Sequence, residues 1–126
     1  MYKFRFLALI LAAVLLMNAP LAASEEIVKK GRALQSAKKF DEALQLYKTA
    51  LKETPSEDLY VESASLLGKL QKYENAETIL EIGIASYPES LSMKNLMGLI
   101  KFRKGDKDGS KKVFEEVLVK DPANNF

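Results

Sequence analysis

The 126-residue sequence contains no cysteine, no histidine and no tryptophan. Without cysteine the chain has no disulfide, no thiol nucleophile and no cysteine to which a lipid could be attached. Without histidine it lacks the commonest general base at neutral pH and the most versatile metal ligand. Adjacent carboxylates such as Glu115 and Glu116 point to different sides of a helix, so they do not form an acid–base pair. We therefore expect no enzyme activity, no cofactor and no metal site.

Glycine-rich ligand loops are also missing. The stretch Lys104–Ser110 (KGDKDGS) resembles the start of a calcium loop, with Asp106 in the first position. Its glycine, Gly109, comes at the fourth position of such a loop instead of the sixth, and Val117 stands where the closing glutamate belongs. We interpret this stretch as a turn between two helices, in which Gly105 adopts the left-handed conformation and Asp106 caps the next helix.

A strong excess of either charge is absent too. The chain has 19 lysines and arginines against 17 aspartates and glutamates. Removal of Lys3 and Arg5 with an amino-terminal leader would lower 19 to 17, which makes the rest of the chain neutral. The basic patch expected of a nucleic-acid-binding protein is not present, so we expect no nucleic-acid partner.

The one long apolar run lies at the amino terminus, at Leu7–Met17, after two basic residues. Small residues follow, ending at Ala22 and Ala23. This three-part pattern predicts a signal peptide over residues 1–23, cleaved after Ala23 or, as the alternative, after Ala22. The run is shorter than the ~20 apolar residues of a spanning helix. An uncleaved inner-membrane anchor is the other interpretation. We expect residues 24–126 to be periplasmic or otherwise exported, with membrane contact only if the leader stays.

The remaining sequence repeats with a period of 33 to 34 residues. Small residues recur at the positions where two antiparallel helices would cross, and a proline ends each copy. A period of this length predicts a stack of helix pairs in which each pair buries its apolar face against its neighbours. The recurring positions are Gly31, Ala64 and Gly98; Ala43, Ala76 and Ser110; and Pro55, Pro88 and Pro122.

Apolar residues at three- and four-residue intervals, together with helix-start signals, predict six helices. The start signals are Asp41, Ser56, Ser90 and Asp106. We place the helices at residues 25–37, 41–53, 57–70, 74–86, 90–103 and 107–119.

This pattern resembles the tetratricopeptide repeat family over Ser24–Pro122. The first copy matches the family pattern at five positions: Gly31, Ala43, Tyr47, Ala50 and Pro55. In the third copy Lys101 stands where the family has a large apolar residue, so we expect the first helix of that copy to be rotated or frayed. The resemblance implies an all-α, right-handed helical solenoid of three repeats after the signal segment. The repeats span residues 24–56, 57–89 and 90–122, within a domain of residues 24–126.

The resemblance also implies that the first helix of each repeat lines a concave groove that takes a peptide or a partner helix. One subgroup of the family clamps a terminal carboxylate there, but among the matching positions of this chain only Arg32 has a suitable charge. We therefore do not expect a carboxylate clamp. The groove residues carried over by position are Val28, Arg32, Gln35, Val61, Ser65, Lys69, Asn95, Leu99, Phe102 and Arg103. The valines and Leu99 have a second interpretation, as core between repeats.

The expected function is a non-catalytic protein–protein interaction adaptor of the cell envelope that binds a protein or peptide partner. The alternative is a structural, self-associating solenoid subunit of an envelope assembly, such as a homodimer. The last predicted helix spreads apolar residues over more than one face, and the closing helix common in the family does not follow Pro122. The residues expected to self-associate are Val113, Val117 and Val119.

Overall fold

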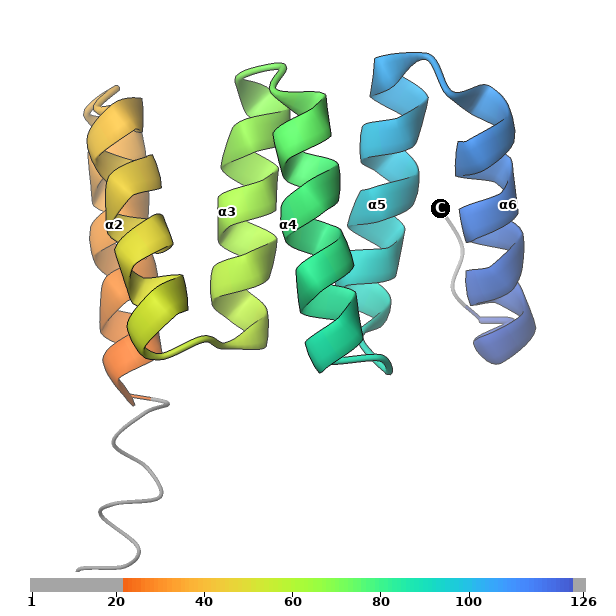
Figure 1. The fold of residues 1–126 in the computed structure, drawn as a ribbon, viewed down its shortest axis with the longest axis horizontal. Coiled ribbons are helices and arrows are strands. Elements are labelled where there is room, and N and C mark those ends of the chain that lie inside the picture. Colours follow the sequence, from red (N-terminus) through yellow and green to blue (C-terminus); the bar gives the residue numbers. More distant parts are fainter. Residues whose placement is uncertain (1–21, 124–126) are drawn as a thin grey trace, which may run out of the picture.

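A computed structural model describes residues 22–123. These residues form helices and no strand, arranged as a row of helix pairs (Figure 1). The prediction of an all-α fold built from helix pairs is therefore confirmed for this part of the chain. The first helix is described over residues 22–36 and is followed by α2 (Phe40–Glu53), α3 (Glu57–Lys69), α4 (Tyr73–Ser86), α5 (Leu91–Lys104) and α6 (Lys107–Lys120).

The predicted signal peptide lies outside the described residues, except for Ala22 and Ala23, which belong to the first helix. Over residues 22–123, none of the helices has both the length and the apolar character needed to cross a membrane.

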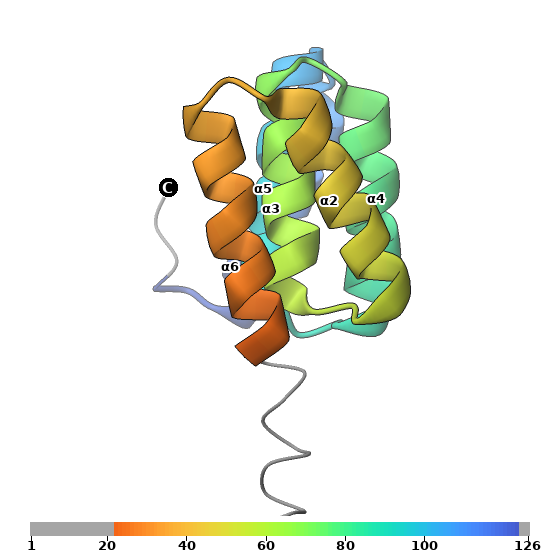
Figure 2. The same cartoon turned by 90° about the vertical axis from the view of Figure 1, so that its left-hand side faces the viewer.

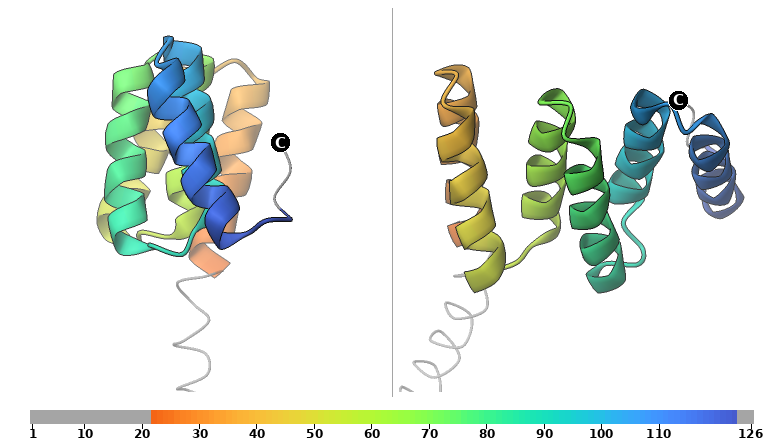
Figure 3. Two further views of the ribbon diagram at one scale, coloured as in Figure 1. Left: turned by 90° about the vertical axis from the view of Figure 1, so that its right-hand side faces the viewer. Right: turned by 45° about the horizontal axis from the view of Figure 1, so that its top comes forward.

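The helices form two layers. The first helix, α3 and α5 form one layer, whereas α2 and α4 form the other (Figures 2 and 3). At the end of the row, α6 packs obliquely against α5. From α2 onward each helix packs against the next along the chain, and α3 also packs against α5 within its layer. The first helix packs against α2, where the ring of Tyr47 lies against Gly31. We call the exposed surface of the first layer the inner face and that of the second layer the outer face. The alternation places the first helix of every repeat on the inner face.

Three of the predicted helix starts are made by side-chain caps. The hydroxyl of Ser56 accepts a hydrogen bond from the backbone N–H of Leu59 at 3.3 Å, and that of Ser90 accepts one from Met93 at 3.2 Å. The carboxylate of Asp106 accepts one from the N–H of Gly109 at 2.9 Å. These bonds satisfy amide groups that have no partner within the helix.

The turn before Asp106 also has the predicted form, because Gly105 has a φ of 100°. Asp41, in contrast, does not cap α2. The N-cap of α2 is Lys39, which makes no side-chain cap, and Asp41 lies in the first turn of the helix. There its negative charge interacts favourably with the positive end of the helix dipole.

The helix pairs cross at the small residues that recur in the sequence. Ala43 and Ala76 are fully buried, and Ser110 is buried at the corresponding position of the third pair. The hydroxyl of Ser110 donates a hydrogen bond to the carbonyl oxygen of Gly98 at 2.8 Å, so the serine is satisfied inside the crossing. A Cβ on Gly98 would lie 2.6 Å from Cε1 of Phe114, so this crossing requires glycine.

Lys101 does not fray α5, which stays helical through Lys104. The ammonium group of Lys101 lies 3.2 Å from the carboxylate of Glu77 on α4, and that of Lys104 lies 2.9 Å from it. Burial raises the pKa of Glu77, but the hydrogen bonds from Lys104 and Lys101 outweigh it, and the net pKa lies below the usual value. An ionic contact between repeats therefore replaces the apolar one that the family pattern expects.

Candidate functional site

The inner face contains a hollow of about 590 Å³ between the first helix and α3. Of the predicted groove residues, Arg32 and Gln35 reach it from the first helix, and Ser65 and Lys69 reach it from α3. Residues 33 positions apart are brought together here because equivalent turns of successive repeats stack. Four of the ten predicted groove residues therefore line one hollow.

Arg32 is already paired inside this hollow. Its guanidinium group forms an ion pair with the carboxylate of Glu62 on α3, and its Nε donates to Oε1 of Glu62 at 3.1 Å. The hydrogen bond that Arg32 donates to Glu62 raises the pKa of Arg32 above its usual value. The pair neutralises Arg32, the one side chain with a suitable charge among the positions that match a carboxylate clamp. The sequence analysis did not identify Glu62 as the partner of Arg32, because the two residues lie 30 positions apart in different repeats.

Gln35 has a structural role in the same region. Its side-chain amide donates a hydrogen bond to the hydroxyl of Tyr47 at 3.1 Å. Tyr47 is fully buried between the first helix and α2, and this burial raises the pKa of its phenol. Gln35 therefore links the inner face to the core of the first repeat.

The third repeat contributes apolar surface to the inner face. Phe102 is 57% exposed and Leu99 is 39% exposed, both on α5, and Arg103 beside them is exposed. Asn95, one turn before Leu99, is half-buried and makes a contact of its own. Exposed aromatic and aliphatic side chains on a helix face are typical of binding surfaces.

The two predicted valines lie deeper than the other groove residues. Val28 is buried in the same core cluster as Tyr47, and only borders a smaller hollow of about 380 Å³ beside Arg32. Val61 is half-buried and packs against the core of the second repeat. Both side chains therefore act mainly between repeats, which was the second interpretation of these positions.

The predicted self-association residues are divided between core and surface. Val117 is 1% exposed and Val113 is half-buried against the core, so Val117 does not present an exposed surface. Val117 is buried because it faces α5 across the last crossing, and Met97 of α5 lines the same hollow. Val119, at 83% exposed, is the residue of the three that faces solvent.

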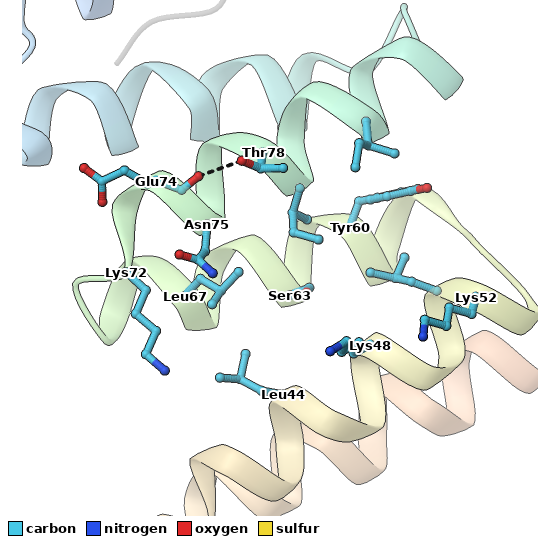
Figure 4. Close-up of a pocket in the computed structure, with 13 residues that line it drawn as sticks. Leu44, Lys48, Lys52, Tyr60, Ser63, Leu67, Lys72, Glu74, Asn75 and Thr78 are labelled. Carbon is cyan, nitrogen blue, oxygen red and sulfur yellow. Dashed lines mark hydrogen bonds between the residues drawn. The ribbon is translucent and has the colours of Figure 1, made fainter.

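A second hollow, of about 660 Å³, was not predicted from the sequence. It lies on the outer face between α2 and α4, with α3 beneath it (Figure 4). Its walls come from helices of two different repeats, and no local motif marks such a combination. We call it the outer groove.

Among the described residues, no group of three or more acidic side chains is placed so that it could hold a metal ion.

Solved structures with the same fold are tetratricopeptide repeat domains. The Sgt2 domain from Aspergillus fumigatus is 21% identical, with a TM-score of 0.72, over 82% of this chain and 70% of that one. The first domain of human RPAP3 is 25% identical, with a TM-score of 0.70, over 78% of each chain. The first domain of Spaghetti (RPAP3), solved bound to the HSP90 peptide SRMEEVD, is 25% identical, with a TM-score of 0.69, over 78% of this chain and 79% of that one.

No curated protein sequence matches the chain. The family described as "Tetratricopeptide repeat protein 21 forth ARM domain" has a sequence model that matches residues 27–104, which is more than half of the chain. This match covers most of the first helix and all of α2 to α5, so it includes the helices that form the inner face. The protein therefore belongs to this family of tetratricopeptide-repeat-like helical solenoids.

Proposed function

We propose that the protein is a non-catalytic adaptor that binds a peptide or helical segment of another protein on its inner face. The observation that carries this proposal is the exposure of Phe102 and Leu99 on α5, in the same layer as the hollow between the first helix and α3. An exposed aromatic side chain with an aliphatic neighbour provides an anchor for a partner, and polar groups around it orient the bound chain. The Spaghetti (RPAP3) domain bound to its HSP90 peptide supports the proposal, because a relative with this fold holds a peptide.

The inner face favours a partner with apolar anchor residues over one that binds through a terminal carboxylate. Glu62 neutralises Arg32, and a carboxylate placed beside that pair would be repelled by Glu62. Lys69 and Arg103 are exposed at the edges of the inner face, where they can contact backbone or side-chain oxygens of the bound segment.

Phe102→Ala should weaken binding by about tenfold, while the free energy of unfolding changes by less than about 0.5 kcal/mol, because an exposed side chain contributes little to folding. Peptides selected from a displayed library on the full chain serve as ligands. Titration calorimetry measures their affinity, and thermal unfolding measures the change in the free energy of unfolding. Ile82→Ala, on the outer face, is the matched control and should leave the affinity for these peptides unchanged. A loss of several kcal/mol of stability in Phe102→Ala would show instead that Phe102 belongs to the core.

We further propose that residues 1–23 are a signal peptide and that residues 24–126 work in the cell envelope, in the periplasm or an equivalent exported location. The basic start, the apolar run and the small residues at Ala22 and Ala23 support this proposal. The intact mass of protein recovered from the envelope fraction should match a chain that begins at Ser24 or Ala23. Recovery of the full-length chain from membranes would favour the uncleaved anchor.

Self-association is the second candidate function, and one observation favours it. Val119 and its neighbour Leu118 are both exposed near the end of α6, beside an apolar hollow of about 460 Å³ between α4 and α6. Burial of such side chains favours association. A molar mass by light scattering that rises with concentration, and that Val119→Asp returns to the monomer value, would support this role, whereas a monomer at all concentrations would exclude it.

A further inference from the structure

We propose that the outer groove is a second docking site, which takes an acidic amphipathic helix from a partner protein. The backbones of α2 and α4 each pack against α3 but do not contact each other, and the groove lies between them. This site is separate from the inner face, which is the surface of the other layer of helices (Figure 2).

The floor and walls of the outer groove are apolar. Tyr60 and Leu67 of α3 form a buried floor. Leu44 and Ile79 are half-buried on the walls, and Ile82, 51% exposed, lies at the edge. A partner that covers this surface would remove apolar area from water, which favours docking.

The rim of the groove carries a positive charge that the chain does not neutralise. Lys48 and Lys52 lie one turn apart on α2, and Lys72 lies at the start of α4 (Figure 4). Within residues 22–123 these three lysines make no ion pair. The carboxylate on the rim, Glu74, is paired with Lys104, whose ammonium group lies 3.6 Å away. The complementary partner is therefore acidic beside its apolar stripe, along the side that faces α2 and near the start of α4.

The chemistry of the groove favours a helix over an extended segment. An extended chain needs hydrogen-bond partners for its backbone N–H and C=O groups, and the groove is mainly apolar. The hydroxyl of Thr78 is already used, because it donates to the carbonyl oxygen of Glu74 at 3.0 Å. A helix satisfies its own backbone and presents apolar side chains at three- and four-residue spacing to the floor. The walls, α2 and α4, each have 14 residues and so extend for ~21 Å, enough to hold four turns of a third helix.

The two end segments of this chain lack the acidic charge that the groove requires. The helix α6 carries four lysines against three acidic residues, and residues 1–21 contain two basic residues and no acidic one. The lysines on the rim would repel both segments from a second copy of the chain. The occupant is therefore a different, acidic protein.

The test uses a labelled 16-residue peptide with leucines on one helical face and glutamates on both flanks, titrated with the full chain by fluorescence anisotropy. Lys48→Glu combined with Lys52→Glu should weaken its binding by about tenfold or more. The two substitutions replace attraction between the lysines and the glutamates of the peptide with repulsion. The matched control, Lys107→Glu combined with Lys112→Glu, makes the same charge change on α6 and should alter the affinity by less than about twofold. All four lysines are exposed, so thermal unfolding should show that both variants fold as the original chain does.

Three further measurements complete the test. Ile82→Ala should weaken binding of the peptide, whereas Phe102→Ala should not, because Phe102 lies on the inner face. A peptide with lysines in place of the glutamates should not bind. Failure of the acidic peptide to bind, or an equal loss in the two double variants, would overturn the proposal. Binding of phosphatidylglycerol vesicles through Lys48 and Lys52, without binding of the peptide, would also overturn it and assign the groove to a membrane surface.

Discussion

Tyr47→Ala should lower the free energy of unfolding by about 3–5 kcal/mol, the usual cost of truncating a large buried aromatic residue. Tyr47 is fully buried, and its ring packs directly against Gly31 of the first helix. Its hydroxyl also accepts the hydrogen bond from Gln35 at 3.1 Å. The substitution therefore leaves a cavity between the first two helices and removes the partner of Gln35. For a domain of this size the melting temperature should fall by about 12 °C or more, measured by circular dichroism.

Tyr47→Phe is the control for this experiment, because it keeps the ring and removes only the hydroxyl. Its cost should be about 1 kcal/mol, the typical contribution of one hydrogen bond. If Tyr47→Ala costs no more than Tyr47→Phe, the ring does not fill the space between the first helix and α2, and the packing described above is wrong.

Ala43→Leu should cost about 1–3 kcal/mol, because it adds side-chain volume to a crossing that has no room for it. Ala43 is fully buried and lies in one cluster with Tyr47 and Leu59. Each repeat is stabilised by packing against its neighbours. The loss of stability should therefore appear as a lower melting temperature of the whole stack and not only of the first pair. Ala33→Leu is the matched control, since Ala33 is exposed on the first helix. An unchanged melting temperature in Ala43→Leu would mean that the assigned repeat register is incorrect.

The fold could be predicted from the sequence because its determinants are local and periodic. Small residues such as Ala43 and Ala76 mark the crossings, and Ser56 and Ser90 mark helix starts through bonds to residues three positions away. The start of α2 was predicted one residue late because Lys39 makes no side-chain cap that a sequence pattern would reveal.

The site was predicted only in part, because its chemistry depends on contacts between repeats. Arg32 and Glu62 are 30 residues apart, so their pairing requires knowledge of how the repeats stack. The expectation that Lys101 disturbs α5 was wrong for the same reason. Lys101 forms an ion pair with Glu77 of the preceding repeat, which the sequence pattern does not reveal. Burial of Val117 depends on the rotation of α6 about its axis, which adjacent apolar residues such as Leu118 and Val119 do not specify.

The most direct test of the proposed function is site-specific photocross-linking from the inner face in living cells. Phe102 is replaced by p-benzoylphenylalanine, and the same group is placed at Lys112, an exposed position on α6, as the control. We expect an adduct with a partner protein from position 102 that is lost when Leu99→Asp is added, and no such adduct from position 112. Absence of an adduct at position 102, or the same adduct from both positions, would contradict binding on the inner face.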